Sequence, residues 1–415
     1  MASAVEELGQ RARDASRVLA SASTVVKNTA LLAAADLLVD RGPEILDANA
    51  GDLTAAERDG LKGAALDRLR LDDSRLEAMA AGLRQVAALP DPIGEVLDGT
   101  RRPNGLDIQR VRVPLGVVAI IYENRPNVTS DAAGICLKSG NAALLRGSSS
   151  ALESNRVVAG LLREGAVKAG LPADAVILVD DAAHETAVEV MQLDEYVDCL
   201  IPRGGPSLIQ SIHDNATVPV IIDGDGNCHV YVDAAADLDV ALDIVFNAKT
   251  NRPGVCNAAE SLVVHRDVAE AFVPRVASAL VDAGVELRGD EPSRLLHPMG
   301  TATDDDYARE FLGLEMSVAV VADLESAIEH VNRFSTGHTE AIVTRDLDAA
   351  RRFTREVDAG VVIVNASTRF TDGERFGFGA EIGTSTQKLH ARGPMGLREL
   401  TTYKYLVWGD GQIVQ

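Results

Sequence analysis

The stretch VPLGVVAIIYENRPNVTSDAAGICLKSGNAALLRG, residues 113–147, decides the fold of this chain. Its run VVAII predicts a buried strand, SDAAGICLKSGNA a helix, and ALLRG a second strand. The alternation continues with a helix over 151–169, a strand at AVILV, a helix over 183–193 and a strand at DCLIP. Repeated strand-helix-strand units predict an α/β fold with a parallel sheet, whose ligands bind at the carboxyl ends of the strands.

Polar and glycine residues follow three of these strands, in the segments YENRPN (122–127), RGSSS (146–150) and PRGGPS (202–207). We expect the three strand ends to form one rim. Gly204 and Gly205 allow close backbone approach, and Pro206 suits the first position of a helix, so this turn predicts a phosphate site on backbone amides. An ordinary strand-to-helix turn is the alternative. No acid follows Arg146 to bind a ribose 2′-hydroxyl, which favours the 2′-phosphate of NADP.

A single thiol, Cys256, lies at a predicted junction in NAKTNRPGVCNAAE, residues 247–260. An amphipathic helix precedes it, Pro253 and Gly254 break that helix, and SLVVH predicts a buried strand after it. Backbone amides at such a turn, with Lys249 and Arg252 near in sequence, favour the thiolate. The sequence therefore predicts a nucleophilic Cys256, with a buried structural cysteine as the alternative.

The other three cysteines, Cys136, Cys199 and Cys228, form no Cys-x-x-Cys pair, which argues against a metal site. Cys228 precedes His229, but adjacent residues of a strand face opposite sides, which argues against a thiol-imidazole pair. Four cysteines, no leader and no apolar run of membrane-spanning length predict a cytoplasmic protein without disulfides.

The charge balance restricts the ligand class. A formal net charge of −22 argues against nucleic acid and anionic membrane as partners, since both require a basic face. Against this background, arginines and lysines clustered in turn-rich stretches predict an anionic small-molecule ligand, with simple pairing to nearby acids as the alternative for each cation. At 415 residues the chain is too long for one simple core, so two domains or more are expected.

Both ends of the chain carry scaffold patterns. Residues 1–90 predict helices, with Gly42 as a stop. The turn Pro103-Asn104-Gly105 separates two extended runs and predicts a hairpin arm at about 96–113. TTYKYLVWGDGQ (401–412) predicts a further strand. Exposed strand edges usually pair with another subunit, so a homodimer or homotetramer is expected.

These patterns resemble the aldehyde dehydrogenase superfamily and, within it, the glutamate-5-semialdehyde dehydrogenase family. The resemblance covers nearly the whole chain and rests on residues 113–147, LIPRGGPSLI (200–209), NAKTNRPGVCN (247–257), VNASTRFTDG (364–373) and AEIGTSTQKLHARGPMG (380–396). It implies an aldehyde dehydrogenase-like fold with a Rossmann-type cofactor domain, an α/β catalytic domain and a small β oligomerisation arm. The implied boundaries are 1–225 for cofactor binding, 226–368 for catalysis, and 369–415 for a return segment and oligomerisation tail.

The resemblance also implies an activity. It is the NADPH-dependent reduction of L-glutamyl 5-phosphate to L-glutamate 5-semialdehyde, with release of phosphate through a thioester on Cys256, in proline biosynthesis. Asn124 falls where the superfamily places its oxyanion-hole amide, and Glu315 where a glutamate holds the nicotinamide ribose. Arg146, Ser148 and Ser149 would line the adenosine ribose. No kinase segment precedes residue 1, so a separate glutamate 5-kinase is the expected functional partner.

One departure from the superfamily favours reduction over oxidation. Oxidative members carry a water-activating glutamate before paired glycines, whereas this chain has Asp223-Gly224-Asp225-Gly226. Asp223 has a shorter reach and is expected to be a poor general base. A reductase should lack a strong base there, because activated water would hydrolyse the thioester.

The substrate's anionic groups have several candidate partners. Arg369, with Asn365, Ser367 and Thr368 beside it, offers donors suited to the α-carboxylate, with a rigid inter-domain turn as the alternative. The cations Arg252, Lys388 and His390, with Arg392, either bind the leaving phosphate or cap their loops.

Two rival functions remain. One is an oxidative aldehyde dehydrogenase acting on another small aldehyde. The other is a non-enzymatic protein that binds NADP or acts as a scaffold.

Overall fold

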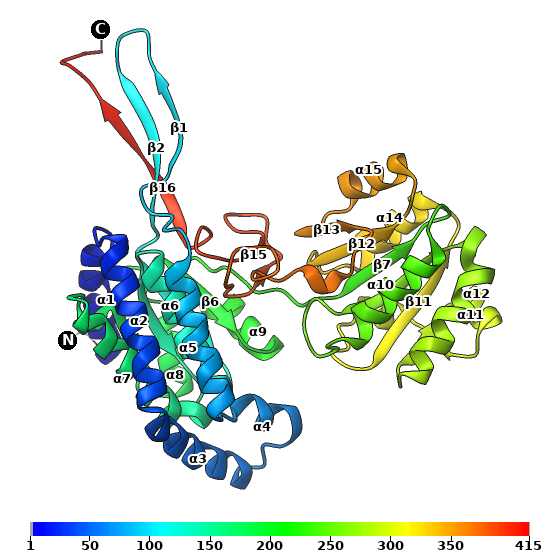
Figure 1. Ribbon diagram of the computed structural model, residues 1–415, viewed down its shortest axis with the longest axis horizontal. Helices are drawn as coiled ribbons and strands as arrows, with labels where there is room; N and C mark the ends of the chain where they lie inside the picture. The colour runs from blue at the N-terminus through cyan, green and yellow to red at the C-terminus, as the bar shows by residue number, and fades with distance from the viewer. Residues whose placement is uncertain (1–2, 415) are drawn as a thin grey trace. The chain divides into compact units, whose positions relative to one another are not determined.

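The computed structural model describes residues 3–414, apart from the side chains of Ala64 and Pro206. The chain forms two compact units (Figure 1). Unit 1 comprises Met1–Ile222, Phe378–Gly383 and Met395–Gln415, and unit 2 comprises Asp223–Gly377 and Thr384–Pro394. The C-terminal residues from 369 onward are therefore divided between the two units. Which unit binds a cofactor and which carries the chemistry stays a prediction.

Unit 1 opens with helices, as the pattern of residues 1–90 predicts. They are α1 (Ala4–Leu19), α2 (Thr24–Asp40), α3 (Gly42–Arg58), α4 (Gly63–Leu69) and α5 (Asp73–Ala88). The prediction for Gly42 was wrong in one respect, because this glycine is the first residue of α3. The preceding residue, Arg41, is both the C-cap of α2 and the N-cap of α3, so one residue separates the two helices.

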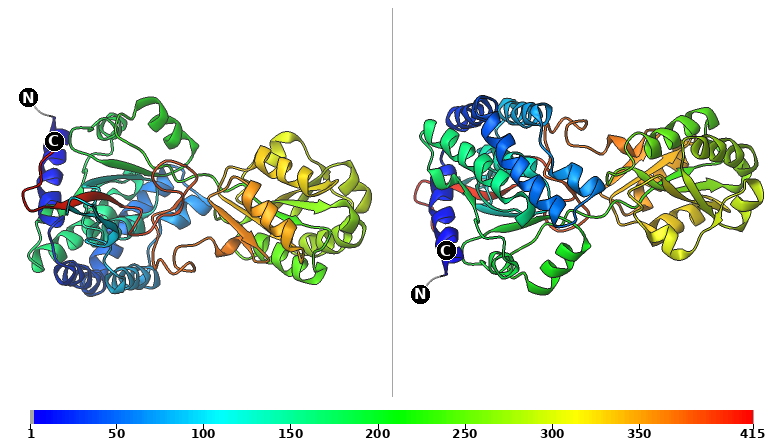
Figure 2. Two further views of the ribbon diagram at one scale, coloured as in Figure 1. Left: turned by 90° about the horizontal axis from the view of Figure 1, so that it is seen from above. Right: turned by 90° about the horizontal axis from the view of Figure 1, so that it is seen from below.

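A four-stranded parallel sheet forms the centre of unit 1, in the order β5-β4-β3-β6. Its strands are β3 (Val117–Tyr122), β4 (Ala142–Arg146), β5 (Val176–Leu178) and β6 (Cys199–Arg203). The connecting helices are α6 (Pro126–Lys138), α7 (Leu152–Lys168) and α8 (His184–Met191), and α9 (Pro206–Asn215) follows β6. Every residue of β3 is buried because helices cover the sheet on both faces (Figure 2).

A three-stranded antiparallel arm extends from unit 1 (Figure 1). It consists of β1 (Val96–Arg101), β2 (Asp107–Pro114) and β16 (Thr401–Trp408), so the predicted hairpin and C-terminal strand are both confirmed. Gly105 takes φ +94° at the hairpin turn, a conformation that favours glycine. β16 pairs with β2 along the whole strand, from Thr401 opposite Pro114 to Trp408 opposite Asp107.

Unit 2 is built on a seven-stranded parallel sheet in the order β10-β9-β11-β8-β7-β12-β13. The strands are β7 (Cys228–Val232), β8 (Ala259–His265), β9 (Glu286–Gly289), β10 (Gly300–Thr301), β11 (Glu315–Val321), β12 (Thr339–Val343) and β13 (Val361–Val364). The helices are α10 (Leu238–Thr250), α11 (Arg266–Asp282), α12 (Glu291–Leu296), α13 (Asp304–Ala308), α14 (Leu324–Phe334) and α15 (Leu347–Glu356).

Two hydrophobic clusters show that this second sheet is covered on both faces. Residues of α10 and α11 pack on one face of the strands. Residues of α14 and α15 pack on the other face, around Tyr231 and Phe353. The α/β, aldehyde dehydrogenase-like fold class is confirmed. Within residues 3–414, no helix combines the length and the apolar character needed to cross a bilayer.

Candidate active site

Cys256 lies in the turn between α10 and β8 and is half-buried. α10 ends at Thr250 with Asn251 as its C-cap, and the chain does not return to regular structure until Ala259. Pro253 stops the helix because its ring clashes with the preceding turn and its nitrogen carries no hydrogen. The predicted junction is therefore confirmed, and the thiol lies outside the core.

Gly226 packs directly against the backbone of Cys256. A Cβ at Gly226 would overlap the carbonyl oxygen of Cys256, so a side chain at this position would displace the cysteine turn. The N–H of Gly226 donates to Oε1 of Glu310 at 2.8 Å, and burial raises the pKa of that carboxyl. Gly226 is thus held between Glu310 and the Cys256 turn.

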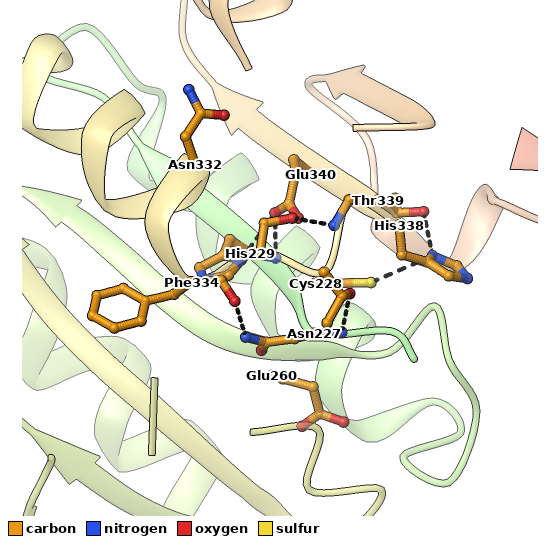
Figure 3. A network of polar contacts seen from close by, with 12 residues as sticks. Asn227, Cys228, His229, Glu260, Asn332, Phe334, His338, Thr339 and Glu340 are labelled. Atoms are coloured by element: carbon orange, nitrogen blue, oxygen red, sulfur yellow. Dashed lines mark hydrogen bonds and ion pairs between the residues drawn. The ribbon is translucent and has the colours of Figure 1, made fainter. Parts of the chain in front are cut away.

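The thiol of Cys228, shown in Figure 3, contacts the Cys256 turn. Its Sγ–H donates to the carbonyl oxygen of Cys256 at 3.2 Å, and the same sulfur lies 3.8 Å from Nδ1 of His338. Both side chains are fully buried. His229 faces a different partner, with Nδ1 3.0 Å from Glu340, so the argument against a Cys228–His229 pair is confirmed.

Burial distinguishes Cys256 from the other three cysteines. It raises the pKa of Cys228 well above its usual range, raises that of Cys199 to about 12, and raises that of Cys136 further. These three groups are neutral thiols at neutral pH. Cys256 is the one cysteine of the described chain that is not fully enclosed, and no cysteine of residues 3–414 is in a disulfide.

The ammonium of Lys249, which lies near Cys256 in the sequence, is buried and has an acidic partner. It forms an ion pair with Glu260 at 2.5 Å, and both side chains are fully buried. Desolvation lowers the pKa of Lys249 and raises that of Glu260 to about 7. The attraction between the two charges shifts each pKa in the opposite direction but does not outweigh desolvation. The other Glu260 oxygen accepts the N–H of Leu312 at 3.2 Å, so the pair ties α10, β8 and the loop before β11 together.

The predicted substrate loop after β13 is bonded to the cysteine turn through Asn257. Thr368 Oγ1 donates to the Asn257 carbonyl at 2.7 Å, and Arg369 Nη1 donates to the Asn257 side-chain oxygen. Desolvation lowers the pKa of Arg369, as does the nearby cation of Arg252, while Asp372 and Cys256 oppose both effects. Arg252, Arg369 and Cys256 therefore share one electrostatic neighbourhood in unit 2.

Two other residues of this loop are hydrogen-bonded to backbone groups, one of them outside the loop. Asn365 takes φ +56°, and its amide both accepts from the N–H of Thr344 at 2.9 Å and donates to the carbonyl of Thr344 at 2.8 Å. Ser367 is buried and accepts the N–H of Arg369 at 3.3 Å. These bonds shape the loop, and the substrate-binding roles of Asn365, Ser367 and Thr368 stay predictions.

Asp358 binds two of the C-terminal cations. Arg392 donates to it at 2.8 Å and Lys388 forms a second ion pair, which together lower the pKa of Asp358. His390 takes φ +69° in the same loop. Loop capping is thus present in the structure, and phosphate binding by Lys388 and His390 stays a prediction.

The carboxylate of Asp223 is occupied by the backbone. Its Oδ1 accepts the N–H of Thr384 at 2.7 Å, and Asp223 forms an antiparallel bridge with Ser385. A Cβ at Gly224 would overlap the side chain of Thr386, which shows how closely the two segments pack. A carboxylate held in this way is poorly placed to activate water.

In unit 1 the three predicted strand ends do meet. Asn124 follows β3 with φ +43°, and its N–H donates to Ser148 Oγ at 3.1 Å, so the first and second strand ends touch. The N–H of Gly205, at the start of α9, donates to Glu123 Oε2 at 3.2 Å, which joins the first end to the third.

The predicted cofactor residues have the following partners. Arg146 Nη2 donates to the carbonyls of Ala182 and Ala183, at 2.7 and 3.0 Å, and its buried Nε has no protein partner. Ser149 is exposed. Glu315 in unit 2 forms an ion pair with Arg288 at 3.0 Å. The side chain of Pro206 lies outside the described residues, although its backbone begins α9 as predicted.

Comparison with known proteins identifies the family to which this chain belongs. The model of the aldehyde dehydrogenase family matches residues 1–299 and 301–406. The chain belongs to the aldehyde dehydrogenase family. It is an enzyme of this family, whose members use nicotinamide cofactors.

Within the aldehyde dehydrogenase family, the chain is similar to one group of enzymes. The chain is 57% identical over 406 residues to the gamma-glutamyl phosphate reductase of Heliobacterium modesticaldum, covering 98% of this chain and 97% of the relative. It is 56% identical over 412 residues to that of Moorella thermoacetica, covering 99% of each. The crystal structure of gamma-glutamyl phosphate reductase from Thermotoga maritima matches all of both chains with a TM-score of 0.97 and 47% identity. Glutamate-5-semialdehyde dehydrogenase is another name for gamma-glutamyl phosphate reductase. The family resemblance inferred from the sequence motifs is therefore confirmed.

Sequence reasoning missed one residue beside Asn124 in unit 1 and two residues near the Cys256 turn in unit 2. Ser150 contacts Asn124, and only its place in the run of three serines signalled it. Glu310 and His338 come from segments far along the chain and carry no local motif. Only the fold brings them to the cysteine turn.

Proposed function

We propose that this enzyme reduces L-glutamyl 5-phosphate to L-glutamate 5-semialdehyde with NADPH and releases phosphate. The observation that carries the proposal is the likeness, over 98% of the chain, to proteins named gamma-glutamyl phosphate reductase. The half-buried Cys256 and the engaged carboxylate of Asp223 support a reductive thioester route.

In the proposed reaction the Cys256 thiolate attacks the acyl carbon, and the carbonyl π electrons move to oxygen. The oxyanion is assigned to the Asn124 side-chain amide and the Cys256 N–H, because preorganised donors stabilise charge that develops in the transition state. The carbonyl then re-forms, the carbon–oxygen bond to phosphate breaks, and phosphate leaves with the electron pair. Phosphate is a weakly basic leaving group, so no strong acid catalyst is needed, and Arg252 and Arg369 are the cations assigned to the substrate's negative charge.

NADPH, when bound, supplies the hydride that converts the thioester to a thiohemiacetal anion. This anion collapses to the semialdehyde and regenerates the Cys256 thiolate. The residues assigned to the cofactor are Arg146, Ser148, Ser149, Gly204, Gly205, Pro206 and Glu315. They fit a phosphate-bearing dinucleotide, because Arg146 keeps a buried Nε without a protein partner and a Cβ at Gly205 would meet no atom within 4 Å. Arg146 also favours NADPH over NADH, since a guanidinium suits the ribose 2′-phosphate.

The reverse reaction tests the proposal without the labile acyl phosphate. Glutamate semialdehyde should reduce NADP only when inorganic phosphate is present, and Cys256→Ser should abolish the reaction. Replacing NADP with NAD in the same assay measures the cofactor preference. Phosphate-independent oxidation of this or another small aldehyde would overturn the proposal and favour an oxidative aldehyde dehydrogenase.

We further propose a cytoplasmic homo-oligomer that receives its acyl phosphate from a separate glutamate 5-kinase. Enzymes of this family are commonly oligomeric. The edge strand β16 carries three exposed hydrophobic side chains, Tyr405, Val407 and Trp408. The four thiols are consistent with a reducing compartment. Light scattering should give a dimer or tetramer, and a monomer at assay concentration would contradict the oligomer.

Faster semialdehyde formation when the kinase is added to glutamate and ATP would support the partnership.

A further inference from the structure

Among the residues that the structure describes, the side chain of Asn124 has hydrogen-bond partners at one end only. Its carbonyl oxygen, Oδ1, accepts from Ser148 Oγ at 3.2 Å and from Ser150 Oγ at a shorter separation. The two hydroxyls are 2.8 Å apart, and Ser148 Oγ also accepts the backbone N–H of Asn124. Two serines therefore enclose the acceptor end of this carboxamide.

The chemical consequence concerns the other end of the amide. An asparagine carboxamide has an acceptor oxygen and an NH₂ donor group, and only the donor stabilises an oxyanion. With the oxygen turned toward two hydroxyls, the NH₂ group points away from them. A carboxamide turned the other way would present an oxygen lone pair to developing negative charge.

The two serines are themselves fixed by the fold. Ser148 is the N-cap of a short 3₁₀ helix (Ser149–Ala151) that contains Ser150. The preceding Gly147 packs so closely on Asn155 that a Cβ there would overlap its side-chain nitrogen. Asn155 in turn accepts the hydroxyl of Thr129 at 2.9 Å, which is fully buried in α6. The serine loop is thus anchored on α6 and α7 as well as bonded to Asn124.

We propose that Ser148 and Ser150 are positioning residues that hold the Asn124 carboxamide with its NH₂ group directed to the reacting carbonyl. The inference rests on the proposed function, in which Asn124 stabilises the oxyanion. It gives the Ser148 hydroxyl a role in turnover, whereas contact with the adenosine ribose would give it a role in cofactor affinity.

Kinetics of the reverse reaction separate these roles. Ser148→Ala and Ser150→Ala should each lower kcat by about two- to tenfold, since each removes one hydrogen bond. The double variant should approach the loss in Asn124→Ala, about a hundred- to a thousandfold for one oxyanion donor. In Ser150→Ala, which removes no residue assigned to the cofactor, KM for NADP should stay within about twofold of the wild type. Ser150→Thr, which keeps the hydroxyl, should retain most of kcat.

A mutant cycle shows whether the serines act through Asn124. In an Asn124→Ala background, removing both serines should cost no further kcat, because residues that act as one unit are strongly non-additive. Ser21→Ala is the matched control, since its exposed hydroxyl, just after the end of α1, donates to the carbonyl of Val18. Thermal unfolding of every variant identifies any that fail to fold.

Three kinetic results would overturn the inference: a raised KM for NADP with unchanged kcat, a full loss added on top of Asn124→Ala, or a wild-type kcat in the double serine variant. A wild type that shows no phosphate-dependent activity would instead refute the proposed function. In that case, crystal structures of the wild type and the double serine variant test the role of the serines independently of the proposed function. The Asn124 side chain should leave its position in the variant, and an unchanged position would refute the role of the serines.

Discussion

At the scale of single residues, the position of Cys256 depends on the absence of a side chain at Gly226. Gly226→Ala should force the cysteine turn to move, because the new methyl group would overlap the Cys256 carbonyl oxygen. We expect a loss of most activity and a destabilisation of about 1–3 kcal/mol, the usual range for overpacking. Urea denaturation and the reverse assay measure the two effects.

The matched control for this substitution is Gly160→Ala. Gly160 lies within α7, where a Cβ would meet no atom within 4 Å. Alanine there should leave activity unchanged and stabilise the helix by roughly 0.5–1 kcal/mol. Normal turnover in the Gly226 variant would show that the cysteine turn tolerates the displacement.

At the scale of elements, the buried Lys249–Glu260 pair joins α10 to β8 on either side of the cysteine turn. Lys249→Met should destabilise the protein by about 3–5 kcal/mol, because it leaves a buried carboxylate without its partner. The double variant Lys249→Met/Glu260→Leu should recover most of that stability, since apolar replacement of a buried pair is often neutral. Urea denaturation of the wild type, Lys249→Met, Glu260→Leu and the double variant gives the coupling free energy. A double variant as unstable as the single one would show that the Leu312 contact matters more than the pair.

The elements also show what the sequence could predict. Apolar runs locate the strands, because a strand covered on both faces needs an unbroken run such as VVAII. The order β5-β4-β3-β6 then brings the ends of β3, β4 and β6 together, which is why Asn124 could be linked to the serine loop. The order of the seven-stranded sheet has no such local signal, since each crossover can place the next strand on either side. Glu310 and His338 were missed for that reason, whereas Cys256 was predicted as a nucleophile from its turn and from the family resemblance.

At the scale of the whole molecule, buried histidines make stability depend on pH. Burial lowers the pKa of His338 to about 4 and that of His330 to about 3. A histidine whose folded-state pKa is depressed binds protons more readily when unfolded, so stability declines as pH falls below its unfolded value of about 6.5. His338 contributes up to about 1.4 kcal/mol per pH unit between pH 6.5 and pH 4.

Melting temperatures across this pH window test that contribution. His338→Gln should flatten the decline between pH 6.5 and pH 4.5, even if it lowers stability at pH 7. His213→Gln, at an exposed position in α9, is the control and should follow the wild-type curve. Parallel curves for His338→Gln and the wild type would show that His338 does not remain neutral in the folded protein.

The central claim is that substrate is carried as an acyl group on Cys256 and that water does not remove it. Mixing the enzyme with NADP and glutamate semialdehyde in the absence of phosphate tests this most directly. NADPH should form in a burst of about one equivalent per chain and then stop, as expected for a trapped covalent intermediate. Acid quenching and mass spectrometry should place the acyl group on the Cys256 peptide, and added phosphate should restart turnover. Steady NADPH formation without phosphate, or an acyl group on another cysteine, would contradict the account.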